Sequence, residues 1–159
     1  MPPPSHRDEP PAGARRPAIR SLVLGGETGF RAHVLAVIAD LGPVAFASIE
    51  LAGDDDPADV VALVLHERPD VVLLDATGRE AGVRRVVLAL AEASVRVGVV
   101  VVCEHSTPAA RQLGAVPKWG WTQDLRGAMQ RAFVERRAPA PSPAGPLAGW
   151  ADQGPRRAD

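Results

Sequence analysis

The sequence has one cysteine, one lysine and no tyrosine among its 159 residues. A lone Cys103 excludes an internal disulfide and any zinc site built from several cysteines. No apolar run approaches the roughly 18–20 residues that a membrane-spanning helix needs, and residues 1–18 lack the apolar core of a secretory signal. A formal net charge of −1 provides no overall attraction to nucleic acid or to an anionic membrane. We therefore expect a cytoplasmic protein whose partners are neither nucleic acid nor membrane.

Both ends of the chain are rich in proline and poor in residues that build a core. Residues 1–18 combine proline with charge, and residues 138–159 are rich in proline, alanine and glycine. Such compositions bury too little apolar surface to offset the entropy lost on folding. The sequence thus predicts one folded domain, over residues 19–137, between two disordered tails.

Between the tails, strand-like and helix-like patterns alternate. Short runs rich in apolar residues predict strands at 19–24, 44–51, 71–74, 97–103 and 115–119. Helical spacing and capping signals predict helices at 30–41, 57–68, 81–93 and 122–137, with at most about two turns within 104–113. Five βα units joined by short loops indicate an α/β fold, in which a parallel sheet carries helices on both faces. The expected architecture is a five-stranded, doubly wound, flavodoxin-like sheet of order 2-1-3-4-5.

The stretch Val71–Gly78 is the most informative part of the chain. Four apolar residues run directly into the carboxylate of Asp75 and then into a turn. This pattern is typical of a buried central strand that ends at the rim of the sheet. Ligands and chemistry in open α/β sheets lie at the carboxyl ends of the strands. Asp75 is therefore the leading candidate for a functional residue, and capping of the following turn is its alternative role.

The phrase Glu67–Asp75 ends a helix, passes through Pro-Asp and continues as a strand into Asp75, and Gly114-Ala115 precedes the fifth strand. In this phrase and in its predicted architecture, the chain resembles response-regulator receiver (CheY-like) domains over most of residues 19–137. The resemblance implies a two-component (phosphorelay) signalling module rather than an enzyme. Asp75 would be the phosphoacceptor, and the partner would be a histidine kinase or a downstream effector protein.

The resemblance also implies a Mg²⁺ site. Receivers hold the metal with an acidic pair at the end of the first strand, together with the acceptor carboxylate. Here Gly25 and Gly26 stand at the two positions of that acidic pair. The carboxylates left as metal ligands are those of Asp75 and of Glu27, the residue after Gly26. Hard oxygen ligands carry a Mg²⁺ site, so the loss of two carboxylates weakens it. We therefore expect a degenerate receiver, or pseudo-receiver, rather than one that depends on Mg²⁺.

The resemblance also concerns the residues that contact the phosphoryl group in the family. Lys118, the only lysine, corresponds to the lysine that follows the fifth strand. Cys103 occupies the strict position of the hydroxyl residue that ends the fourth strand, and Ser106 and Thr107 lie just beyond it. The resemblance therefore implies Lys118, Ser106 and Thr107 as contacts to a phosphoryl group.

Two aromatic residues near the end of the domain suggest how a signal leaves it. No folded output domain is expected after residue 137, so the output is expected to be a protein contact. Trp119 and Trp121 alternate across one residue and would face the same way on a strand. They either pack against the last helix or form an exposed interaction surface. The sequence leaves a homodimer open.

The segment Gly25–Gly29 has two interpretations. It is either a tight turn between strand and helix, or a loop that cradles phosphate at a helix N-terminus. It matches neither the dinucleotide-binding fingerprint nor a P-loop. The alternative function is accordingly a flavodoxin-like binder of a small ligand or nucleotide that uses this loop.

Overall fold

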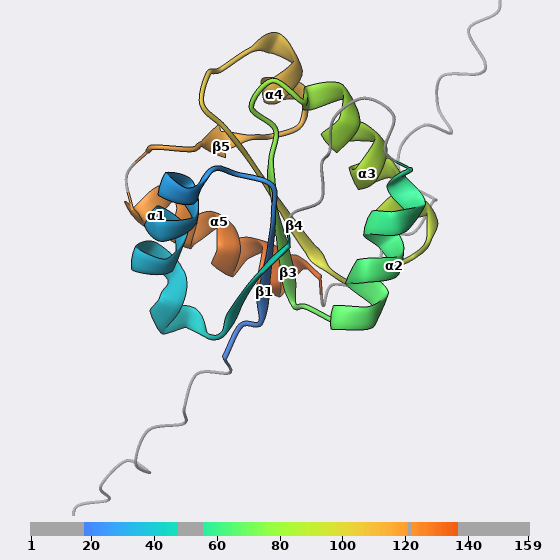
Figure 1. Cartoon of the computed structure of the whole chain (residues 1–159), viewed down its shortest axis with the longest axis horizontal. Helices are drawn as coiled ribbons and strands as arrows, with labels where there is room; N and C mark the ends of the chain where they lie inside the picture. Colours follow the sequence, from blue (N-terminus) through green and yellow to red (C-terminus); the bar gives the residue numbers. More distant parts are fainter. Residues whose placement is uncertain (1–17, 48–55, 121, 137–159) are drawn as a thin grey trace, which may run out of the picture.

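Strands and helices alternate along the whole domain in the computed structural model, which describes residues 18–47, 56–120 and 122–136 (Figure 1). The strands are β1 (Ser21–Leu24), β2 (Val44–Ala47), β3 (Val71–Asp75), β4 (Gly98–Cys103) and β5 (Val116–Pro117). The helices are α1 (Thr28–Ile38), α2 (Pro57–Glu67), α3 (Glu80–Glu92), α4 (Pro108–Gln112) and α5 (Thr122–Glu135), and a short 3-10 helix, η1 (Ala39–Leu41), follows α1. Apart from residue 18, the two predicted tails lie outside the described residues.

The strands form one parallel sheet of order β2-β1-β3-β4-β5, which confirms the predicted fold class. Strand β3 lies at the centre, paired with β1 on one side and β4 on the other. Helices α1 and α5 cover one face, and α2 and α3 cover the other (Figure 1). None of the helices in the described ranges is long and apolar enough to cross a membrane.

The core consists of two apolar layers that share the central strands. Along β3, Leu73 packs in the layer of α1 and α5, whereas Leu74 packs in the layer of α2 and α3. Every residue of β3 is buried, as expected for a parallel strand with helices on both faces. Among the described residues, only two buried side chains carry a formal charge, Asp75 and Lys118. The fold therefore removes one carboxylate and one ammonium from water together.

The predicted strand at 115–119 is wrong in length, since β5 comprises only Val116–Pro117. The cause is α4, whose five residues span about 7.5 Å at 1.5 Å per residue. Strand β4 has six residues and is about 20 Å long, so the chain turns back before it reaches the start of β4. Strand β5 consequently pairs only with Val102 and Cys103. Lys118 directly follows β5 and its N–H donates a hydrogen bond to the carbonyl of Cys103 at 2.9 Å, which places Lys118 at the carboxyl rim.

The helix predicted at 30–41 ends three residues early, because α1 stops at Ile38 and the 3-10 helix η1 continues the chain to Leu41. The other predicted boundaries agree to within two residues where they are described. Strand β3 includes Asp75, one residue more than predicted. Asp56 caps α2, because its carboxylate accepts a hydrogen bond from the N–H of Ala58 at 2.9 Å. Helix α5 begins at Thr122, as predicted. The predicted second half of the strand at 44–51 lies outside the described residues.

Candidate functional site at the carboxyl ends of the strands

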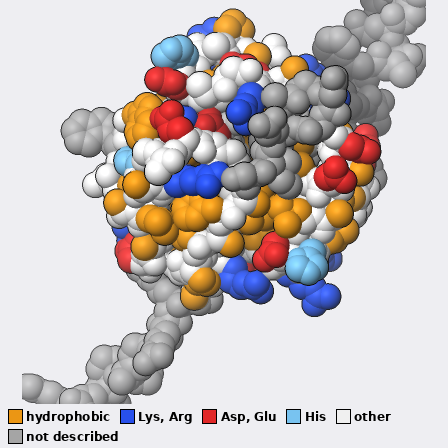
Figure 2. Space-filling view, in the orientation of Figure 1, with side chains coloured by type: hydrophobic (Ala, Val, Ile, Leu, Met, Phe, Trp, Pro, Cys, Tyr) orange, Lys and Arg blue, Asp and Glu red, His pale blue; other side chains and the backbone are white. Residues whose placement is uncertain are grey.

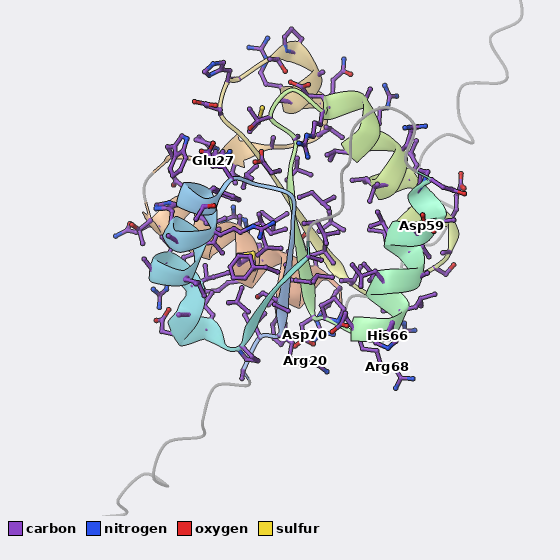
Figure 3. All side chains as sticks on the ribbon, in the orientation of Figure 1. Arg20, Glu27, Asp59, His66, Arg68 and Asp70 are labelled. Carbon is purple, nitrogen blue, oxygen red and sulfur yellow. The ribbon has the colours of Figure 1, made fainter. Side chains whose placement is uncertain are left out.

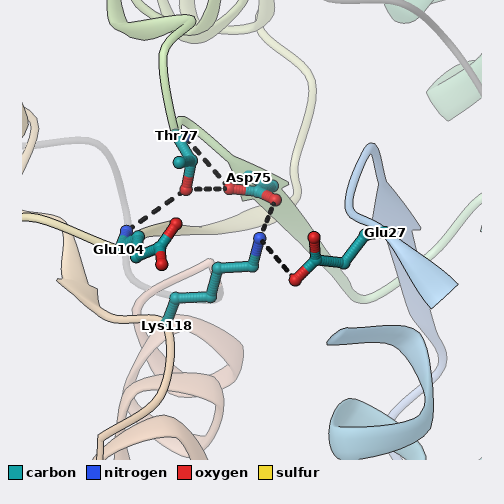
Figure 4. A network of polar contacts seen from close by, with 5 residues as sticks. All are labelled: Glu27, Asp75, Thr77, Glu104 and Lys118. Atoms are coloured by element: carbon teal, nitrogen blue, oxygen red, sulfur yellow. Dashed lines mark hydrogen bonds and ion pairs between the residues drawn. The ribbon is translucent and has the colours of Figure 1, made fainter. Parts of the chain in front are cut away.

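Three charged side chains predicted from the sequence meet at the carboxyl rim of the sheet (Figure 4). Asp75 ends β3, Lys118 follows β5, and Glu27 follows β1. The Nζ atom of Lys118 lies 2.8 Å from Oδ2 of Asp75 and 3.8 Å from Oε1 of Glu27. Parallel strands bring their carboxyl ends to one edge, which is why residues so distant in sequence converge. The functional roles predicted for them remain predictions.

Asp75 is held on both of its oxygens. Its side chain faces Lys118 through Oδ2, and Oδ1 accepts hydrogen bonds from the N–H of Thr77 at 3.0 Å and from its hydroxyl at 2.7 Å. The Thr77 hydroxyl also accepts a hydrogen bond from the N–H of Glu104 at 3.2 Å. Thr77 therefore links the end of β3 to the residue after β4. The sequence analysis missed it, although an Asp followed two residues later by Thr is a recognisable turn pattern.

The surroundings keep Asp75 ionised. Burial raises the pKa of this carboxyl, but hydrogen bonds from Lys118 and Thr77, with the charge of Lys118, lower the pKa by more than burial raises it. The pKa of Asp75 therefore lies below its usual value. At neutral pH the site holds a carboxylate, the form that a phosphoacceptor needs, but with only 6% of the residue exposed.

Two aromatic rings enclose the ammonium of Lys118. Its Nζ lies 4.9 Å from the ring centre of Phe30 and 5.6 Å from that of Trp119, within the range of cation–π attraction. The two rings meet edge to face with their centres 6.0 Å apart. The rings shield Lys118 from water, so its charge depends on Asp75 for compensation.

The residues at this rim do not fit a Mg²⁺ ion. Mg²⁺ requires a near-octahedral set of oxygen ligands. At the two positions where receivers carry acidic residues, this chain has Gly25 and Gly26, which supply no side-chain oxygen. An ammonium already occupies Oδ2 of Asp75. A Cβ atom placed on Gly25 would lie 3.8 Å from Nη1 of Arg79, so a second cation stands beside that position. In the described part of the chain, no three His, Cys, Asp or Glu side chains form a group that could hold a metal.

The backbone at the two glycines also opposes an acidic pair. Gly25 and Gly26 have φ angles of 79° and 83°, a left-handed conformation that favours glycine. A Cβ on Gly26 would lie 2.6 Å from Cδ1 of Phe30. The Phe30 ring thus fills the space that a side chain at residue 26 would need. Residues 25–27 connect β1 to α1, and Thr28 and Gly29 are the first residues of α1. The alternative role of Gly25–Gly29 as a ligand loop stays a prediction.

The contacts of Ser106 and Thr107, the two predicted hydroxyl residues, do not include Asp75 in the described part of the chain. Thr107 caps α4, since its hydroxyl accepts a hydrogen bond from the N–H of Ala110 at 3.0 Å, and it also contacts Oε1 of Glu80 at 3.4 Å. Ser106 is exposed to solvent. Neither hydroxyl has a hydrogen bond to Asp75 among the contacts of the described residues. Their predicted contact with a phosphoryl group is therefore a proposal only.

Trp119 is half-exposed, at 48%. One side of its ring packs against α1, with ring centres 6.0 Å from Phe30 and 5.5 Å from His33. Because β5 ends at Pro117, the prediction that Trp119 and Trp121 share one side of a strand is wrong for Trp119. Trp121 lies outside the described residues. Trp119 therefore joins the buried Lys118 site to the molecular surface.

Solved structures with the same arrangement include several receiver domains. The signal receiver domain of a Luxo repressor protein from Vibrio parahaemolyticus superimposes with a TM-score of 0.55 at 15% identity, over 74% of this chain and 95% of that one. The signal receiver domain of NarL from Mycobacterium tuberculosis gives 0.52 at 23% identity, over 74% and 98%. A CheY-like protein (tadZ) from Pseudomonas aeruginosa gives 0.52 at 18% identity, over 71% and 98%.

Comparison of the sequence with protein-family models and with curated proteins gives no match. At these low identities, likeness to solved structures establishes the fold and not the activity. The order of the strands, the flanking helices and the solved structures agree on one architecture. The chain has the fold of response-regulator receiver (CheY-like) domains.

Proposed function

We propose that the protein is a receiver-like signalling module of the two-component type, which acts through contact with another protein. The observation that supports this proposal best is the 2.8 Å pair between Asp75 and Lys118 at the carboxyl rim of a receiver fold. Asp75 is the position at which a phosphoryl group would be attached, through attack of its carboxylate on a phosphodonor. The partner would be a histidine kinase or a downstream effector.

The charges at the rim favour a degenerate receiver whose Asp75 is held without Mg²⁺. Lys118 compensates the Asp75 carboxylate directly, and Gly25 and Gly26 offer no side-chain oxygens. A buried and fully paired carboxylate is also a poor nucleophile until Lys118 or Thr77 releases it. We therefore expect the Asp75 site to act mainly as a structural centre that positions the neighbouring surface.

Intact-protein mass spectrometry tests this part of the proposal. The full chain is incubated with acetyl phosphate, with and without Mg²⁺, and Asp75→Asn serves as the control. We expect no gain of a phosphoryl group that depends on Mg²⁺. A gain that requires Mg²⁺ and disappears in Asp75→Asn would show an active phosphorelay site and would contradict the degenerate assignment.

Site-specific crosslinking tests the protein contact. A photoreactive amino acid replaces Trp119 in cells of the source organism, and the same residue replaces Leu88 on α3 as a control. The two positions are similarly exposed, at 48% and 53%. We expect a discrete adduct at position 119 only, with a two-component protein identified by mass spectrometry. An adduct between two copies would reveal a homodimer instead, and equal adducts at both positions would contradict a specific contact surface at Trp119.

A further inference from the structure

A hollow lies at the opposite end of the sheet from Asp75, where the strands begin. It has a volume of about 500 Å³ and is lined by residues from the ends of α2, α3 and α5, among them Leu65, Arg68, Val95, Arg96 and Arg136. Figure 3 shows Arg68 and His66 at this end, with Arg20 and Asp70, far from Glu27 at the other. Strand β3 separates the two ends by about 16 Å, at roughly 3.3 Å per residue. The hollow is therefore independent of the rim.

The hollow carries unbalanced positive charge. Among the described residues that line it, Asp70 is the only acidic one, and both oxygens of its carboxylate are engaged. Its Oδ2 accepts a hydrogen bond from the N–H of Arg20 at 2.8 Å, and its Oδ1 pairs with Nη2 of Arg136. Arg68 and Arg96 are exposed, and neither has an ion-pair partner among the residues that the structure describes. Figure 2 shows basic side chains along the lower edge of the molecule.

Arg136 and Arg68 have different roles in the hollow. The guanidinium of Arg136 is already engaged, because it pairs with Asp70 and lies 4.4 Å from the ring centre of Phe133. Arg68 ends α2 with a φ of 48°, in the left-handed conformation that normally selects glycine. Non-glycine residues in this conformation concentrate at binding and catalytic sites. An incoming anionic group would meet the exposed side chain that Arg68 keeps at this position.

The apolar lining narrows the class of ligand. Leu65 is 55% exposed at the edge of the hollow, and Val95 and Pro69 line it beside the arginines. A free phosphate ion would use the guanidinium groups alone and leave these surfaces in water. We propose that the hollow binds an acidic peptide segment of a partner protein, with carboxylates on Arg68 and Arg96 and an apolar side chain against Leu65 and Val95. This binding does not depend on the chemistry of Asp75.

Titration followed by NMR of the full, isotope-labelled chain tests the proposal. The probe is a short synthetic peptide of glutamates around one central leucine. We expect amide shifts at Leu65, Arg68 and Arg96 but not at Trp119, and weaker binding as salt is added, because ion screening acts on exposed charges. Arg96→Ala should weaken binding about tenfold, which corresponds to the loss of one charge-assisted contact.

The substitution Arg68→Gly separates binding from folding. Glycine suits the left-handed backbone, so we expect this variant to bind about tenfold more weakly without a lower melting temperature. Arg84→Ala, at an exposed arginine of α3, is the matched control and should bind as the wild type does. Unchanged binding in both Arg68→Gly and Arg96→Ala would overturn the proposal. Equal binding of a peptide with serine in place of leucine, or displacement by inorganic phosphate at the peptide's own concentration, would reduce the hollow to a simple anion site and would also overturn it.

Discussion

The substitution Lys118→Met removes the ammonium that compensates Asp75 while keeping a side chain of similar length against Phe30 and Trp119. Asp75 is 6% exposed and would keep only its two hydrogen bonds from Thr77. Breaking one partner of a buried ion pair typically costs about 3–5 kcal/mol. Because Thr77 still supports the carboxylate, we expect the lower end, a loss of about 3 kcal/mol in the free energy of unfolding at neutral pH.

Urea denaturation followed by far-ultraviolet circular dichroism measures this loss. The double variant Asp75→Asn/Lys118→Met is expected to recover most of it, because removal of both charges leaves no uncompensated ion. Arg126→Met is a matched control at the surface, where Arg126 pairs with the exposed Asp40, and it should cost less than about 1 kcal/mol. A loss below about 1 kcal/mol in Lys118→Met, or a double variant no more stable than the single one, would refute the reasoning.

The pH dependence gives the same prediction a second readout. The pKa of Asp75 is lowered in the folded wild type, so its stabilising contribution is complete above the unfolded pKa of about 3.9 and is lost as the pH falls through the folded value. Without Lys118, burial raises the pKa of Asp75, and the sign reverses. The deficit of Lys118→Met should therefore narrow between about pH 7 and pH 5. A constant deficit over this range would contradict the coupling.

Three further substitutions have definite expected outcomes. Thr77→Val removes the hydroxyl bond to Asp75 and should cost about 1–2 kcal/mol in urea denaturation, whereas Thr77→Ser should cost less; equal losses would exclude the hydroxyl as the cause. Gly26→Asp should lower the melting temperature and produce no Mg²⁺ binding in calorimetry, because its Cβ would lie 2.6 Å from Cδ1 of Phe30; a stable variant that binds Mg²⁺ would show that a metal site can be rebuilt. Leu74→Ala should cost about 2–5 kcal/mol, and a much smaller loss would mean that β3 is not packed against α2 and α3 as described.

Much of the fold was predictable because its causes are local. The four apolar residues before Asp75 predict a strand buried on both faces, and helical spacing of apolar residues predicts α1, α2, α3 and α5. Asp56 before Pro57 marks the start of α2 through capping chemistry that acts within one turn. The order of the strands follows from right-handed crossovers and the number of βα units. The length of β5 could not be obtained this way, because it depends on how far α4 carries the chain back along β4.

The residues of the candidate site were likewise predictable in part, whereas most of their contacts were not. Asp75 was identifiable from its place at the end of a strand, and Lys118 from the resemblance to receiver domains. Their contact depends on the tertiary pairing of β4 with β5, which places Lys118 beside the end of β4. Thr77 belongs to the site through its hydrogen bonds to Asp75. The sequence pattern of this turn, an Asp followed two residues later by a Thr, was not used in the prediction. The ring of Phe30 fills the space beside residue 26 because the first turn of α1 places it there, four residues along the chain.

The hollow around Arg68 shows most clearly where sequence reasoning ends. Arg68, Arg96 and Arg136 follow three different helices and share no motif or spacing. Local patterns along the chain determine which segments become strands and helices, since hydrogen bonding and apolar periodicity act over a few residues. Only the packed tertiary structure decides which charges meet, because the paired Asp75 and Lys118 and the basic hollow are each assembled from segments that the parallel sheet brings to a common end.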